Sequence, residues 1–184
     1  MHPYVALGVA TFGPIDLTPT SPTYGYIQQT PKSGWSHTDV LTPLRSVNPS
    51  APLKFDTDVN APAMSEYALS VSSGSPCTSV AYVTVGTGVG VGIVVNGKPV
   101  HGLMHPEAGH VPVVPLPGDE FPGYSWGERC PFGGQHTVES IASGVGVLER
   151  LGYDAGKSED RGVLKELGDG DPLREDRLVG GGHA

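Results

Sequence analysis

Short apolar blocks, separated by glycine and proline, are the main pattern along this chain. Residues 5–11 form a mostly apolar run that stops before Gly13 and Pro14, and residues 79–85 (SVAYVTV) are β-branched or aromatic almost throughout. Runs of this length and composition are typical of buried strands. We therefore predict strands over residues 5–11 and 79–85, each leading into a glycine-containing turn.

Glycine occupies every other position from Gly86 to Gly92, directly after the second predicted strand. A further strand is predicted over residues 93–95, and it runs into Asn96 and Gly97. Asn-Gly is the strongest short hairpin signal, because both residues tolerate positive φ. The segment from residue 79 onward is therefore predicted to be a set of antiparallel strands.

Two helices are predicted from their starting signals. Asn60, with a proline two residues later, marks the start of a helix that ends near Gly74, because Asn can cap free amides and Pro is tolerated in the first turn. Thr137 is predicted to cap a second helix over residues 138–151, with Glu139 in its first turn.

The remaining segments have weaker patterns. Residues 18–52 are rich in Pro, Thr and Ser without periodicity and are predicted to be irregular, and residues 53–55 form a short strand. Residues 102–129 are predicted to be mostly loop, and the charged residues after position 151 a surface helix or tail. The chain has no internal repeat.

Composition narrows the fold class. The chain has 184 residues, of which 27 are Gly and 18 are Pro. This excludes coiled coils and helical solenoids, because internal Gly and Pro destabilise helices. The length suits one domain or two small lobes. We expect three parts: an N-terminal α/β part with a Pro- and Thr-rich excursion (1–60), a central part (61–148) and a charged C-terminal segment (149–184).

Charge and hydropathy narrow the function. The 11 basic and 19 acidic residues give a net charge of −8, which argues against nucleic-acid binding. No apolar run approaches the roughly 20 residues of a membrane span, and the N-terminus does not resemble a signal peptide. We expect a soluble, cytoplasmic protein that binds no membrane. Cys77 and Cys130 are too few for a disulfide scaffold.

The glycine run has three candidate interpretations. A dinucleotide fingerprint fails, because its third glycine would fall on Val91 or Ile93. A P-loop over residues 92–98 fails, because Pro99 stands where a hydroxyl must bind the metal. The third interpretation is a turn at residues 86–88 whose amides hold a phosphate. A plain hairpin packed against a neighbour remains the alternative.

Acidic and metal-binding side chains supply two further candidates. Asp58 lies between a predicted strand and a predicted helix start, where it can act as a general base; capping or a solvated surface is the alternative for Asp56 and Asp58. His110, Cys130 and His136 can coordinate Zn²⁺, and the alternative is surface histidines with a buried thiol.

Taken together and in this order, five segments resemble the sugar kinases of the ROK (repressor, open reading frame, kinase) family, and within it the bacterial-type fructokinases. They are residues 8–16 (GVATFGPID), 56–63 (DTDVNAPA), 83–92 (VTVGTGVGVG), 107–110 (EAGH) and 130–132 (CPF).

The resemblance implies an α/β, actin-like ATPase fold with ribonuclease-H-like lobes, here incomplete: the end of the first lobe and the start of the second. It implies that Asp58 is the catalytic base. The implied sugar-binding residues are Asn60, Glu107, His110 and Glu139, the implied ATP-phosphate turn is Gly86, Thr87 and Gly88, and the implied zinc ligands are His110, Cys130 and His136.

The implied activity is the ATP-dependent phosphorylation of a hexose, D-fructose to fructose 6-phosphate, with Mg²⁺ accompanying ATP. Hexose and ATP are then the partners, and a homodimer is expected where the full-length family fold is present. The alternative is a catalytically inactive sugar-binding remnant. A ROK-type transcriptional regulator is disfavoured by the charge of −8 and by the lack of a helix-turn-helix segment.

Three departures from the family pattern matter. Gly133 and His136 stand where the fructokinase metal loop has His and Cys, so the zinc site has at most three matched ligands. The family's N-terminal Asp-Gly-Gly-Thr-type phosphate loop and several C-terminal helices are not found. We therefore expect a chain truncated at both ends that exposes apolar surface and associates or aggregates.

Overall fold

The computed structural model describes residues 4–30, 32–102, 105–125 and 134–154. It divides into two compact units. The first unit comprises residues 1–83 and 91–106, and the second comprises residues 84–90 and 107–184. Among the described residues, no helix has both the length and the apolar character needed to cross a bilayer.

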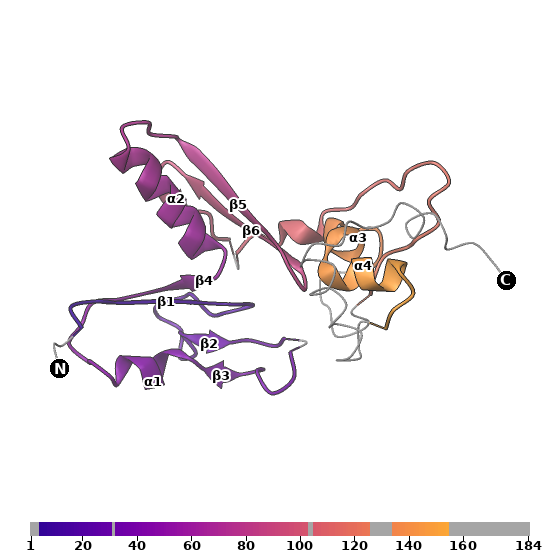
Figure 1. The fold of residues 1–184 in the computed structure, drawn as a ribbon. Coiled ribbons are helices and arrows are strands. Elements are labelled where there is room, and N and C mark those ends of the chain that lie inside the picture. The colour runs from indigo at the N-terminus through magenta and orange to yellow at the C-terminus, as the bar shows by residue number, and fades with distance from the viewer. Residues whose placement is uncertain (1–3, 31, 103–104, 126–133, 155–184) are drawn as a thin grey trace. The chain divides into compact units, whose positions relative to one another are not determined.

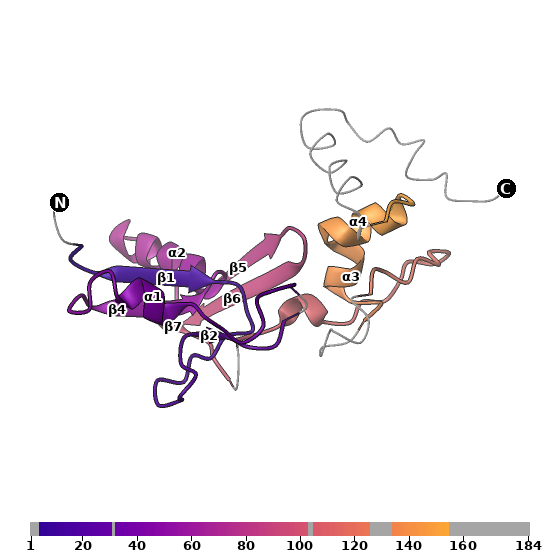
Figure 2. The same ribbon diagram turned by 90° about the horizontal axis from the view of Figure 1, so that it is seen from below.

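A parallel pair of strands begins the first unit (Figures 1 and 2). β1 (Leu7–Thr11) pairs with β4 (Leu53–Thr57), with Leu7 opposite Leu53 and Thr11 opposite Thr57. The strands predicted near residues 5–11 and 53–55 are therefore confirmed. Because the two strands are parallel and in register, both end at the same edge of the sheet, where the chain continues into Phe12 and Asp58.

The segment between these strands is more regular than its sequence predicts. It contains β2 (Tyr26–Ile27), antiparallel to β3 (Thr38–Asp39), and the short helix α1 (Leu41–Arg45). The prediction of irregular structure was wrong here, because the Asp39 carboxylate accepts hydrogen bonds from the first amides of α1. The core of this unit is apolar and consists of Ile15, Ile27, Leu41 and Phe55.

α2 (Asn60–Ser72) follows β4 and packs against it. Asn60 was predicted to cap this helix, which is wrong: Asn60 is the first helical residue, and its N–H donates to the Thr57 hydroxyl at 3.0 Å. The helix ends one residue before Ser73, and Gly74 has a φ of 77°, so the predicted end near Gly74 is confirmed.

A three-stranded sheet follows in the order β5 (Ser79–Val85), β6 (Val89–Val95) and β7 (Lys98–Pro99), and β6 and β7 are antiparallel. Asn96 and Gly97, with φ of 49° and 75°, form the predicted turn between β6 and β7. β6 begins at Val89, four residues before the predicted strand at 93–95. Within β6 the backbone of Gly92 lies so close to α2 that a Cβ there would overlap the Val59 carbonyl.

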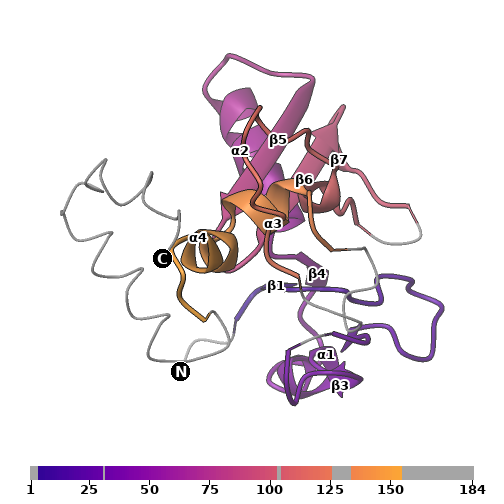
Figure 3. The ribbon, with the colours of Figure 1, turned by 90° about the vertical axis from the view of Figure 1, so that its right-hand side faces the viewer.

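The second unit contains a 3₁₀ turn, η1 (Ala108–His110), and two short helices, α3 (Val138–Ala142) and α4 (Gly144–Arg150) (Figure 3). One helix over residues 138–151 was predicted, and this is wrong. Ser143 is extended, with a ψ of 164°, and its hydroxyl accepts from the N–H of Gly146, so it ends α3 and caps α4. Val145 and Leu148 form the buried core.

Candidate active site

Asp58 occupies the turn between β4 and α2 in the first unit. Its N–H donates to the carbonyl of Thr11 at 2.9 Å, and its side chain is exposed. Because β1 and β4 are parallel, this turn lies beyond their carboxyl ends, where open α/β sheets bind ligands. The free amides of the first turn of α2 also favour a negative charge nearby. An exposed carboxylate at this edge suits a general base.

Lys32 is a neighbour of Asp58 that sequence reasoning missed. Its Nζ lies 3.5 Å from the centroid of the Phe12 ring, and Phe12 in turn contacts Trp35 edge-on, with 5.4 Å between ring centroids. The pKa of Lys32 is lowered overall. Desolvation lowers it, and the negative charge of Asp58 opposes this with a smaller effect. Lys32 lies in the Pro-, Thr- and Ser-rich segment 18–52, whose sequence has no pattern that would place this lysine near Asp58.

Asn60, predicted to bind sugar, is completely buried at the start of α2. Its side-chain Nδ2 donates to Oδ1 of Asp56 at 2.9 Å and lies 3.0 Å from Nε2 of His101. The sequence placed Asp56 and Asn60 in one motif but gave no signal for His101, which is 41 residues further along.

The predicted phosphate turn, residues 86–88, lies at the tip between β5 and β6. The N–H of Gly86 donates to the carbonyl of Gly88 at 2.8 Å, and the carbonyl of Gly86 accepts from the N–H of Gly144 at 2.7 Å. The turn is therefore fixed internally and by the amino end of α4. The strand–turn–strand geometry is the one that both the phosphate-turn interpretation and the plain-hairpin alternative predict.

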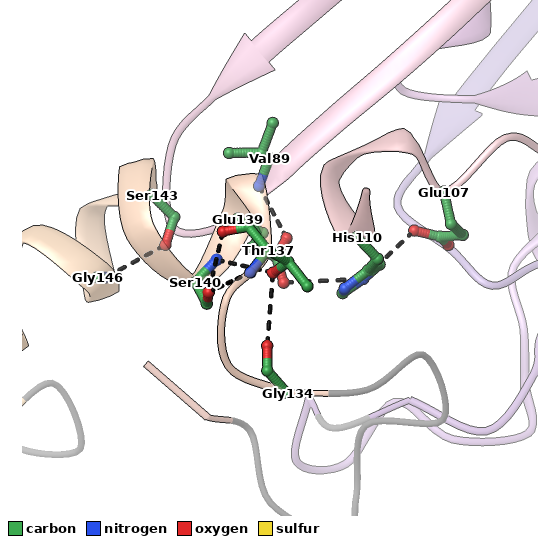
Figure 4. Close-up of polar contacts among 9 residues, drawn as sticks. All are labelled: Val89, Glu107, His110, Gly134, Thr137, Glu139, Ser140, Ser143 and Gly146. Atoms are coloured by element: carbon green, nitrogen blue, oxygen red, sulfur yellow. Dashed lines mark hydrogen bonds and ion pairs between the residues drawn. The ribbon is translucent and has the colours of Figure 1, made fainter. Parts of the chain in front are cut away.

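Glu107, His110 and Glu139 lie together in the second unit (Figure 4). Nε2 of His110 is 3.7 Å from Oε2 of Glu107 and 3.8 Å from Oε1 of Glu139. The three side chains are only 24%, 14% and 12% exposed, in the order Glu107, His110 and Glu139. Two carboxylates that flank one imidazole offer several acceptors to hydroxyl groups of a ligand.

Local structure fixes the position of Glu139. Thr137 and Ser140 form a reciprocal cap at the start of α3: the Thr137 hydroxyl accepts from the N–H of Ser140 at 3.1 Å, and the Ser140 hydroxyl accepts from the N–H of Thr137 at 2.8 Å (Figure 4). The cap predicted at Thr137 is confirmed. Oε2 of Glu139 accepts from the N–H of Val89 at 2.8 Å.

The zinc ligands predicted from sequence are only partly described. Cys130 lies outside the described residues. The ring of His110 lies near the carboxylates of Glu107 and Glu139. His136 is exposed, and its φ is 60°. In the described ranges, no group of three or more His, Cys, Asp or Glu side chains is arranged to hold a metal ion. The described donor set therefore does not by itself form a zinc site.

Comparison with known sequences gives a consistent result. A sequence model of the ROK family matches residues 1–178. A fructokinase of Zymomonas mobilis is 44% identical over 150 residues, which cover 81% of this chain and 47% of the relative. A putative fructokinase of Bacillus subtilis is 38% identical over 162 residues, covering 88% and 51%. A kanosamine kinase of Amycolatopsis mediterranei and a glucokinase of Aeropyrum pernix match at 31% and 33% identity.

Solved structures agree with the sequence comparison. A ROK family glucokinase from Streptomyces griseus, in complex with glucose and AMPPNP, superposes with a TM-score of 0.55 and 27% identity, over 90% of this chain and 48% of that chain. A ROK hexokinase from Thermus thermophilus gives a TM-score of 0.55 and 25% identity, over 90% and 51%. The chain spans about half the length of the relatives it matches.

Proposed function

The chain belongs to the ROK family, and we propose that it takes part in the ATP-dependent phosphorylation of a hexose. The α/β fold of actin-like ATPase type expected from the sequence is confirmed by the solved ROK kinases that it resembles. The observation that carries the proposal is the cluster of Glu107, His110 and Glu139, because paired carboxylates beside an imidazole suit a polyhydroxylated ligand.

In the proposed reaction, Asp58 accepts the proton of the sugar hydroxyl that attacks the γ-phosphate of ATP. Its carboxylate is exposed beyond the end of β4, where a ligand can reach it. Glu107, His110 and Glu139 bind and orient the sugar, and Asn60, which the sequence also predicted to bind it, is buried and supports the turn that presents Asp58. Phosphoryl transfer depends mainly on such positioning and on neutralising charge, so these few side chains are a reasonable set.

The turn at residues 86–88 is proposed to bind the phosphates of ATP. The amide of Gly86 donates to the carbonyl of Gly88. The amide of Val89, the residue directly after the turn, donates to the Glu139 carboxylate. The binding role then falls to the amides of Thr87 and Gly88 and to the Thr87 hydroxyl. Glycine on both sides of Thr87 allows a phosphate to approach the backbone closely.

Two metal ions enter the proposal in different ways. Mg²⁺ accompanies ATP as part of the substrate and neutralises phosphate charge. Zinc, held by His110, Cys130 and His136, is proposed only as a structural ion. Metal analysis of the purified chain beside its Cys130→Ser variant tests this: zinc in stoichiometric amount in the parent and lost in the variant supports the site, and equal contents in both contradict it.

Fructose is the proposed hexose, because the curated relatives with the higher identities are named fructokinases. Relatives named glucokinase and kanosamine kinase make glucose and an amino sugar the comparison substrates. A coupled assay for ADP release with these three sugars at equal concentration ranks them. The highest kcat/KM with fructose supports the proposal, and a higher value with another sugar replaces fructose in it.

The role of Asp58 is tested by Asp58→Asn. We expect kcat to fall by about 10²-fold or more, because the amide cannot accept the proton. Glu66→Gln is the matched control, since Glu66 is an exposed carboxylate in α2 of the same unit. Unchanged turnover in Asp58→Asn, beside an active parent, would remove Asp58 from the proposal.

The alternative proposed from the sequence is a sugar-binding protein without turnover. Calorimetric titration separates it from the kinase. Hexose binding without binding of AMPPNP, together with no ADP release, favours the alternative, and binding of both ligands favours the kinase. A loss of hexose binding in Glu107→Gln and Glu139→Gln is expected under either function, because both use the same carboxylates.

A further inference from the structure

Three nitrogen atoms of the first unit converge on one oxygen of Asp56. Its Oδ1 accepts from the N–H of Thr57 at 2.7 Å and from Nδ2 of Asn60 at 2.9 Å, and it lies 3.2 Å from Nε2 of His101. Asp56 belongs to β4, Asn60 begins α2, and His101 lies two residues after β7. A single carboxylate oxygen therefore joins a strand, a helix start and a segment 45 residues away.

Nε2 of His101 is within hydrogen-bonding distance of both members of the Asp56–Asn60 pair. It lies 3.0 Å from Nδ2 of Asn60 and 3.2 Å from Oδ1 of Asp56. A protonated Nε2 donates to Oδ1 of Asp56, and an unprotonated Nε2 accepts from Nδ2 of Asn60. In either tautomer the ring is bonded to this pair.

These bonds enclose the turn that carries Asp58. Thr57 and Asn60 flank the turn, and the backbone N–H of Asn60 donates to the Thr57 hydroxyl at 3.0 Å. Asn60 is 0% exposed, and its Oδ1 has no hydrogen-bond partner among the residues that the structure describes. The amide of Asn60 is thus held through Nδ2, by Asp56 and by the neighbouring His101.

From this geometry we propose that Asp56 and His101 are positioning residues for Asp58. His101 bonds to the Asp56–Asn60 pair, Asp56 accepts from both ends of the turn, and the turn presents the Asp58 carboxylate. The inference rests on the proposed function, in which Asp58 is the general base. A base that is displaced by about 1 Å loses much of its catalytic effect. Loss of the His101 contact is therefore expected to lower kcat while the protein stays folded.

Two substitutions at His101 test the proposal in the hexose-phosphorylation assay. His101→Phe keeps an aromatic ring without the ring nitrogens, and His101→Gln supplies a side-chain amide, which can both donate and accept, in their place. We expect kcat to fall about tenfold in His101→Phe with the KM for MgATP unchanged, and to stay within about threefold of the parent in His101→Gln. Equal losses in both variants, or no loss in either, would overturn the proposal.

A second measurement separates this inference from the proposed function. If the parent phosphorylates no hexose, the proposed function fails, and ¹⁵N NMR spectra of the 184-residue chain test the positioning alone. We expect His101→Phe to shift the side-chain amide of Asn60 and the backbone amide of Asp58 and to speed hydrogen exchange of the former, and His101→Gln to retain the parent signals. Parent-like signals in His101→Phe would contradict the proposal.

Discussion

Oε2 of Glu139 accepts a hydrogen bond from the backbone N–H of Val89 at 2.8 Å, across 50 residues of sequence. The same carboxylate lies directly over Gly88, where an added Cβ would be 2.5 Å from Oε2. A predicted sugar-binding side chain is therefore held by the strand that leaves the predicted phosphate turn. The absence of a side chain at position 88 is a condition for this contact.

Gly88→Ala tests this contact, with Gly86→Ala as the matched control. A Cβ at Gly86 meets nothing within 4 Å, whereas a Cβ at Gly88 displaces the Glu139 carboxylate. We expect hexose affinity to fall about tenfold or more in Gly88→Ala relative to Gly86→Ala, because Glu139 loses a charge-assisted hydrogen bond and its position. Calorimetric titration measures this. Equal affinities in the two variants would contradict the prediction.

The pair Lys32 and Asp58 predicts a change that needs no substrate. The Asp58 carboxylate raises the pKa of Lys32, against the larger effect of burial, which lowers it. Asp58→Asn removes the carboxylate charge, so the pKa of Lys32 should fall further below its ordinary value. NMR titration of the Lys32 side chain measures this shift, and Glu66→Gln provides the control. A pKa of Lys32 that rises or stays constant in Asp58→Asn would refute the electrostatic link.

Asp16 predicts how the stability of the first unit depends on pH. Hydrogen bonds from Ser21, Thr23 and Thr18 lower its pKa, the Ser21 bond most, and desolvation opposes them. A lowered folded-state pKa contributes stability above the unfolded value of about 3.9, and this contribution is lost as pH falls through the folded pKa.

Asp16→Asn should therefore be less stable than the parent by about 0.5–1.5 kcal/mol at neutral pH, and the difference should shrink below about pH 4. Thermal melts over a series of pH values measure it. Ser21→Ala, which removes one donor and keeps the carboxylate, should show a smaller loss with the same pH dependence. A difference that grows as the solution becomes acidic has the wrong sign.

The close contact between β6 and the start of α2 leaves no room for a side chain at Gly92. A Cβ at Gly92 would overlap the backbone carbonyl of Val59, which cannot rotate away as a side chain does. We expect Gly92→Ala to lower the free energy of unfolding by about 1–3 kcal/mol, as overpacking does. Gly8→Ala, in β1 with nothing within 4 Å of its Cβ, is the control. Urea denaturation of the two variants measures the difference, and equal unfolding midpoints in Gly92→Ala and Gly8→Ala would contradict this prediction.

Features that depend on neighbouring residues could be predicted from the sequence. The Asn96-Gly97 turn, the Thr137 cap and the strand over residues 79–85 are each decided by the backbone preferences of a few adjacent side chains, and the structure has all three. Five short segments in the family's order, from residues 8–16 to residues 130–132, were together also enough to identify the resemblance to the ROK family.

Predictions of helix starts and ends from neighbouring residues were wrong at two places. The helix predicted over residues 138–151 is interrupted because the Ser143 hydroxyl bonds to the N–H of Gly146. Asn60 does not cap α2, because Val59 occupies the cap position and Asn60 is already the first helical residue. In both cases the sequence does not say which residue takes the cap position.

The sequence by itself determined the local elements, the family and the residue types that can bind a sugar or accept a proton. Only the tertiary structure decided that His101 lies against Asp56 and Asn60, and that Glu139 bonds to Val89. The physical reason is range: turns and caps depend on bonds within a few residues, whereas these contacts join segments 41 to 50 residues apart and form only when the strands and helices between them pack.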